Sequence, residues 1–133
     1  MDCDINNFCE KIIPYIDEYQ NNLDYIIALM IREIRTNDLV YINNLEIWYE
    51  YNLFLKKWNL FNFDEIIKQV YTFDIFFENN LKSFIKKSDL NLNNKIHLLR
   101  IVKNLVSYIS DMKYDEDEIY KECCKLFSIS NLI

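Results

Sequence analysis

Hydrophobic residues recur with a helical period along most of the chain, most clearly between residues 94 and 110. On a helical wheel of about 100° per residue, the apolar side chains of this segment cover a continuous arc of about 180°. Arg100, Lys103 and Asn104 lie in the opposite, polar sector. A surface helix needs an apolar stripe of only about 100°. The pattern therefore predicts that residues 94–110 form the central helix of a compact bundle.

The same period predicts helices on both sides of this segment. The first covers residues 4–19, and Pro14 is expected to kink or break it because proline removes one backbone hydrogen bond. A second runs from residues 21–22 to 35. Further helices are expected at 62–78, at 81–87 after a break at Asn79-Asn80, and from Asp115 to 127. Candidate N-caps are Asn21 or Asn22 for the second helix, Asn62, and Asp115.

Residues 39–58 allow two interpretations. Apolar residues alternate from Leu45 to Leu55, close to the period of a strand. The alternate face nevertheless carries Trp48 and Phe54, no turn dipeptide interrupts the run, and a lone strand would have no partner. We therefore interpret this segment as a helix.

The composition supports a helical fold. The chain of 133 residues has no glycine and one proline, and 51% of its residues are hydrophobic. Phosphate-binding loops depend on glycine, so nucleotide-binding fingerprints are excluded. Tight hairpins also favour glycine, which argues against an all-β fold. The sequence predicts one all-α domain over residues 1–133, with about six to seven helices around a hydrophobic central helix.

Charge and hydropathy exclude several kinds of partner. The net charge is −6, and the lysine pairs at 56–57 and 86–87 are isolated. Nucleic-acid binders usually carry a basic patch, so we expect no nucleic-acid partner. Neither the central segment nor the C-terminal residues are apolar for long enough to cross a bilayer, and no signal peptide is recognisable. We expect no membrane span.

The residues that usually carry chemistry are sparse. Cys3, Cys9, Cys123 and Cys124 have no metal-ligand spacing, so we expect reduced thiols, no metal and no cofactor. His97 is the only histidine and has no nucleophile at a recognisable spacing. Among the carboxylates only Asp74 lies within an apolar stripe. These observations predict that the chain is not an enzyme.

Aromatic residues are concentrated between Phe63 and Phe77, where Phe73 and Phe76 add more bulk than one helical stripe can bury. Two interpretations follow. The rings fill a core that contains almost no alanine, or they line a groove that accepts an amphipathic helix of a partner.

The organisation of residues 63–127 resembles that of the Bcl-2-like proteins of poxviruses. The resemblance is carried by three stretches, FDEIIKQVYTFDIFFENNLKSFIKK, SDLNLNNKIHLLRIVKNLVSYISDM and KYDEDEIYKECCKLF. They are similar to the groove helix with the short helix after it, the central helix, and the following helix of that family. The glycine-containing NWGR motif of the cellular relatives is absent.

This resemblance implies a protein of the host cell cytoplasm that acts by binding. It implies suppression of host apoptosis by capture of pro-apoptotic BH3 helices in a hydrophobic groove. Alternatively, it implies inhibition of NF-κB or interferon induction through a host adaptor or kinase. The groove residues carried over are Val70, Phe73, Phe77, Leu81, Phe84, Leu98 and Val102, with Arg100 as a partner for the aspartate of a BH3 helix. A structural homodimer is a further alternative.

Overall fold

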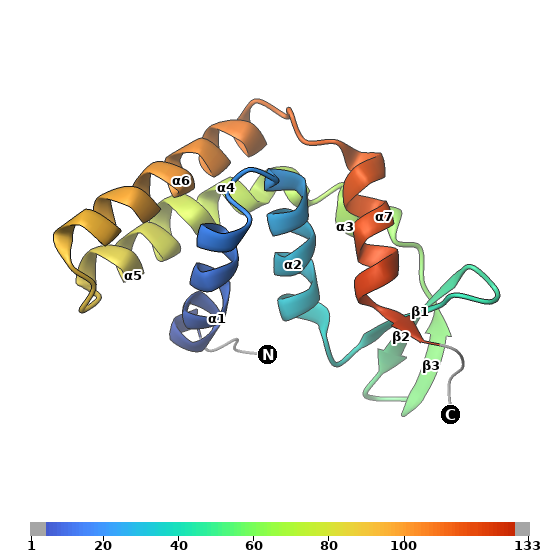
Figure 1. The fold of residues 1–133 in the computed structure, drawn as a ribbon. Coiled ribbons are helices and arrows are strands. Elements are labelled where there is room, and N and C mark those ends of the chain that lie inside the picture. The colour runs from blue at the N-terminus through green and yellow to red at the C-terminus, as the bar shows by residue number, and fades with distance from the viewer. Residues whose placement is uncertain (1–4, 130–133) are drawn as a thin grey trace.

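The fold is α+β, so the prediction of an all-α bundle is wrong. The computed structural model describes residues 5–129 and contains a four-stranded sheet beside its helices (Figure 1). The elements follow in the order α1 (Ile5–Glu18), α2 (Leu23–Arg35), β1 (Leu39–Ile42), β2 (Ile47–Asn52), β3 (Lys57–Leu60), α3 (Asp64–Ile67), η1 (Val70–Thr72), α4 (Phe73–Phe76), η2 (Phe77–Leu81), α5 (Lys82–Lys87), α6 (Leu92–Ser110), α7 (Glu116–Leu126) and β4 (Ser128–Ile129).

The central helix of the fold is α2, not the segment 94–110. All six residues from Ile26 to Ile31 are buried, and Figure 1 shows α2 between α1 and α7. A helix that is apolar all round must be buried on every side, and α2 contains the small Ala28. The helix α6 forms, as expected, over nearly the predicted residues, but only one stripe of it is buried.

Side-chain caps begin three of these helices. Asn22 Oδ1 accepts a hydrogen bond from Tyr25 N at 3.2 Å, and Asp115 Oδ1 accepts one from Glu118 N at 3.1 Å. Both caps were predicted. Asn91 caps α6 in the same way. Pro14 lies within a continuous α1, so the alternative that it breaks the helix is wrong.

The segment 62–87 is helical but irregular. Short α-helical turns alternate with a 3-10 turn at η1 and a π turn at η2. The π turn carries the helix through Asn79 and Asn80, where a break was expected. Its wider winding keeps Phe77, Leu81 and Ile85, spaced four residues apart, on the core side.

Residues 39–60 form strands, so the helical interpretation of 39–58 is wrong. β1 pairs antiparallel with β2, β2 pairs antiparallel with β3, and β4 adds in parallel to β1. The segment supplies its own partner strands, which removes the objection of a lone strand. Glu46 and Lys56 adopt positive φ values of 55° and 52° in the two turns, so the hairpins close without glycine.

One hydrophobic core joins the helices to one face of the sheet. The buried cluster includes side chains from α1, α2, η2, α5, α6 and α7, together with Leu39 and Trp48 from the sheet. Figure 1 places the sheet at one end of the molecule, next to α7. Within residues 5–129, no helix is long and apolar enough to cross a membrane.

Candidate interaction surface

The residues predicted to line a groove lie mainly in the core. The structure brings α4, η2, α5 and α6 together, and their facing side chains pack directly against one another. The five buried members of the predicted set are Val70, Phe77, Leu81, Leu98 and Val102. These side chains stabilise the fold, and they offer no open channel to a partner helix in this structure.

The other three predicted residues are separated from one another. Phe73 lines a small cavity of about 90 Å³ with Ile31, Ile34 and Arg35. Phe84 borders a hollow of about 460 Å³ on the side of α5 that faces the start of α1. Arg100 is exposed on α6. The hollows beside Phe73 and Phe84 share no lining residue.

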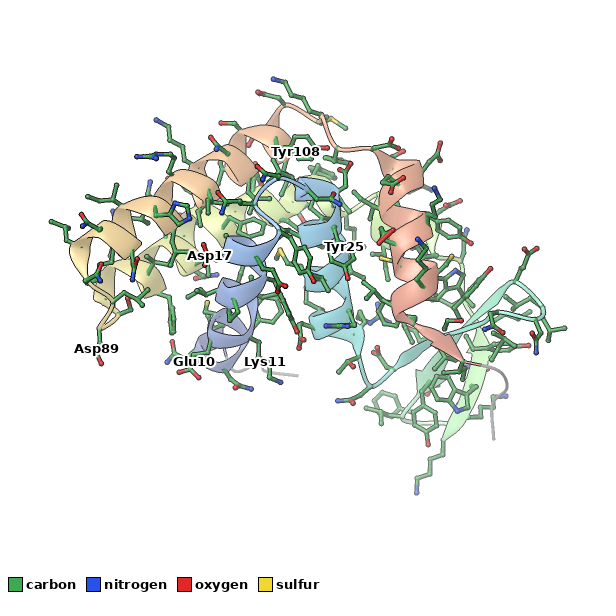
Figure 2. The ribbon with its side chains drawn as sticks, viewed as in Figure 1. Glu10, Lys11, Asp17, Tyr25, Asp89 and Tyr108 are labelled. Carbon is green, nitrogen blue, oxygen red and sulfur yellow. The ribbon has the colours of Figure 1, made fainter. Side chains whose placement is uncertain are left out.

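His97 and Asp74 both link neighbouring helices. His97 Nε2 on α6 lies 3.0 Å from Asp17 Oδ1 on α1, and Figure 2 shows Asp17 between these helices. Ser110 Oγ donates to Asp74 Oδ2 at 2.8 Å, which joins α6 to α4. Both contacts have a structural use, and the prediction that the chain is not an enzyme stays a prediction.

The thiols in the described range are poorly placed for chemistry. Cys9 and Cys123 are buried. Burial raises the pKa of the Cys123 thiol well above its usual range, and burial also raises the pKa of Cys124. Cys3 lies outside the described residues. Between residues 5 and 129, no group of three histidine, cysteine, aspartate or glutamate side chains is arranged to hold a metal ion.

The inner face of the sheet packs on the helices through an aromatic cluster. Trp48 on β2 is buried, with ring centroids 4.3 Å from Phe63 and 5.4 Å from Phe127. Its Nε1 donates to Tyr120 Oη on α7 at 3.3 Å. Because side chains alternate along a strand, Glu50 lies on the same face, where it pairs with Arg35 of α2.

The outer face of the sheet is also apolar. Its positions follow from the register, since residues adjacent to those of the inner face point the opposite way. It consists of Val40, Ile42, Ile47, Tyr49, Tyr51, Trp58 and Leu60. None of the seven is charged, and Tyr51 and Trp58 contact each other across the strands with ring centroids 5.2 Å apart. We call this set the outer face.

The outer face is separate from the core. Ile42 is buried, with 4% of its surface exposed, and five of the other six side chains are half-buried. None of the seven belongs to the main cluster of buried residues or packs against it. Leu60 is 73% exposed. An antiparallel sheet with one solvated face normally turns its apolar side toward the core and its polar side toward water. In β2 and β3 the apolar side is the outer face, while the inner face carries Glu50, Asn52, Lys57 and Asn59. The outer face thus has the composition of a surface that is covered.

Sequence reasoning missed this surface because it assigned 39–58 to a helix. The alternation from Leu45 to Leu55 was the available signal, because its apolar side includes Ile47, Tyr49 and Tyr51 of the outer face.

Comparison with known proteins adds no relative: no protein-family model, no curated protein and no solved structure matches the chain.

Proposed function

We propose that the chain is a protein-interaction module that binds a partner protein through the outer face of its sheet. The observation that carries the proposal is the second apolar face, which has no charged residue and lies outside the core. Leu60 is exposed and five of the other side chains are half-buried, and accessible apolar surface of this kind marks interaction sites in folded proteins. Tyrosine and tryptophan, both present here, are also enriched in protein interfaces.

The proposal retains the expectation that the chain acts by binding but moves the binding surface. A BH3 helix would require access to Phe77, Leu81 and Val102, and all three are buried. We therefore place no function on a BH3 groove. Binding to an adaptor or kinase of innate signalling stays a prediction about the identity of the partner, as does the host cytoplasm as the location.

Site-specific photo-crosslinking tests the proposal. A photoreactive phenylalanine analogue replaces Leu60 on the outer face or, as the matched control, Leu92 on α6. The two leucines are 73% and 72% exposed, so local accessibility is equal. The expected result in cells expressing the chain is a discrete cross-linked product from position 60 and none from position 92.

A second substitution shows whether the product depends on the outer face. Tyr49→Lys places a charge at the middle of this face, and we expect it to remove the product from position 60 while the circular dichroism spectrum stays unchanged. Equal labelling from positions 60 and 92, or labelling unaffected by Tyr49→Lys, contradicts the proposal. A product of twice the 16.3 kDa chain mass identifies a second copy as the partner, which is the homodimer alternative.

A further inference from the structure

The turn between β2 and β3 exposes three consecutive large apolar side chains. Leu53 is 74% exposed, Phe54 is 97% exposed and Leu55 is 61% exposed. Lys56 and Lys57, which follow directly, are exposed as well. We call residues 53–57 the hairpin tip. Figure 1 shows this turn at the lower edge of the molecule, with α6 at the opposite side.

The backbone presents the hairpin tip in a defined conformation. Asn52 pairs with Lys57 at the end of the ladder, and Asn52 Oδ1 accepts a hydrogen bond from Leu55 N at 2.9 Å. Lys56 completes the turn with a φ of 52°. The apolar side chains of the tip are therefore held in solvent by the turn, and the core does not accommodate them.

The chemistry of the hairpin tip is suited to a lipid surface. Consecutive residues in a turn point in different directions, so they do not form the flat patch that a folded partner covers, whereas fluid acyl chains surround a side chain from all sides. The two lysines make the tip locally positive in a chain of net charge −6. Anionic headgroups attract lysine and repel the acidic remainder of the molecule, which directs the tip toward the bilayer.

The aromatic residues next to the tip fit the same arrangement. Tyr51 and Trp58 stand on the two strands directly behind Asn52 and Lys57, in contact with each other. Tryptophan and tyrosine favour the headgroup region, where the ring lies in an apolar layer and its polar group stays hydrated. An inserted tip brings this pair to that level.

We propose that the hairpin tip docks on membranes that contain anionic phospholipids by inserting Leu53, Phe54 and Leu55 between the headgroups. This is a peripheral contact of a turn. It shares Tyr51 and Trp58 with the outer face, but the three inserting side chains, Leu53, Phe54 and Leu55, lie outside that face. The lysines contribute attraction over a screening length of about 8 Å at physiological salt, so binding falls as the salt concentration rises.

Co-sedimentation of the full chain with vesicles tests this inference. Vesicles of phosphatidylcholine and phosphatidylserine are compared with vesicles of phosphatidylcholine alone. We expect binding to the anionic vesicles, at least tenfold weaker binding by Phe54→Asp, and unchanged binding by Leu92→Asp, which alters another exposed apolar side chain on α6. The double variant Lys56→Gln with Lys57→Gln should bind more weakly and lose most of the salt dependence.

Tryptophan fluorescence gives a second readout. The chain has two tryptophans; Trp48 is buried, and Trp58 adjoins the tip. Binding should shift the emission to shorter wavelength, and Trp58→Phe should remove that shift while sedimentation persists. The inference is overturned if the unaltered chain does not sediment with anionic vesicles, or if Phe54→Asp sediments equally well. It is also overturned if vesicles stay unbound while Phe54→Asp removes the cross-linked product from position 60, because the tip then belongs to the protein-binding surface.

Discussion

At the scale of residues, tyrosine hydroxyl groups hold together elements that are distant in sequence. Tyr108 Oη on α6 donates to Asp24 Oδ1 on α2 at 2.6 Å, and Figure 2 shows Tyr108 where α6 approaches the start of α2. Asp115 N, at the cap of α7, donates to the same oxygen at 3.1 Å. One carboxylate thus fixes three helices. Burial, together with this hydrogen bond and the charge of Asp24, raises the pKa of the Tyr108 phenol well above its usual value.

We predict that Tyr108→Phe destabilises the chain by about 2 kcal/mol at neutral pH, since it removes a hydrogen bond to a charged acceptor. The raised pKa means that the folded chain keeps the phenolic proton to higher pH than the unfolded chain. The stabilisation of the fold by the protonated Tyr108 phenol is therefore complete below about pH 10 and is lost as the pH rises beyond it. Urea unfolding across this range should show a shallower alkaline loss of stability in Tyr108→Phe.

Tyr71→Phe is the control for this prediction, because the Tyr71 ring is 54% exposed. It should leave the stability at neutral pH nearly unchanged. An alkaline slope that is identical in the unaltered chain and in Tyr108→Phe would contradict the assignment.

At the scale of elements, the helices were predictable and the sheet was not. The segments that became α1, α2, α6 and α7 have a helical period in the sequence, and α2 and α7 also have the predicted caps at Asn22 and Asp115. The hairpins lack the usual signals. Their turns contain Asn43-Asn44-Leu45-Glu46 and Leu53-Phe54-Leu55-Lys56, and in both a charged residue adopts the left-handed conformation for which glycine is normally used. Because the chain has no glycine, its hairpin turns carry none of the usual glycine signals in the sequence.

The candidate site was hidden for the same reason. The groove predicted from the aromatic residues of 63–77 depended on a surplus of rings, but Phe63 and Phe77 are buried in contacts with the sheet and helices. The strands 39–60 create the inner face that covers Phe63. Because residues 39–58 were interpreted as a helix, neither the burial of the Phe63 and Phe77 rings nor the existence of the outer face could be inferred.

The left-handed position in the first hairpin leads to a stability prediction. Glu46 has a φ of 55°, a conformation that costs a residue with a Cβ atom roughly 1 kcal/mol or more. Glu46→Gly relieves this cost, and Glu46→Ala removes the same carboxylate while keeping the Cβ atom. We expect the glycine variant to be more stable than the alanine variant by about 1 kcal/mol in urea unfolding. Equal stability of the two would show that the turn relaxes without strain.

At the scale of the whole molecule, sheet and helices share one core. Trp48 contacts Phe63 and Phe127, and its Nε1 donates a hydrogen bond to Tyr120 Oη on α7. Arg35, at the end of α2, bonds both Asp38 and Glu50. The sheet is therefore attached to the helices by aromatic packing and by an ion pair, although its outer face is free of the core.

This shared core predicts that the chain unfolds in a single transition, as expected for one domain over residues 1–133. In the variant Trp58→Phe, fluorescence reports Trp48 alone and so follows the contact between sheet and helices, while circular dichroism at 222 nm follows the helices. The two urea curves should coincide in midpoint and slope. If the sheet were only appended to an independent helical unit, the loss of Trp48 fluorescence would precede the loss of helix, and a chain with two separate transitions would contradict the single core.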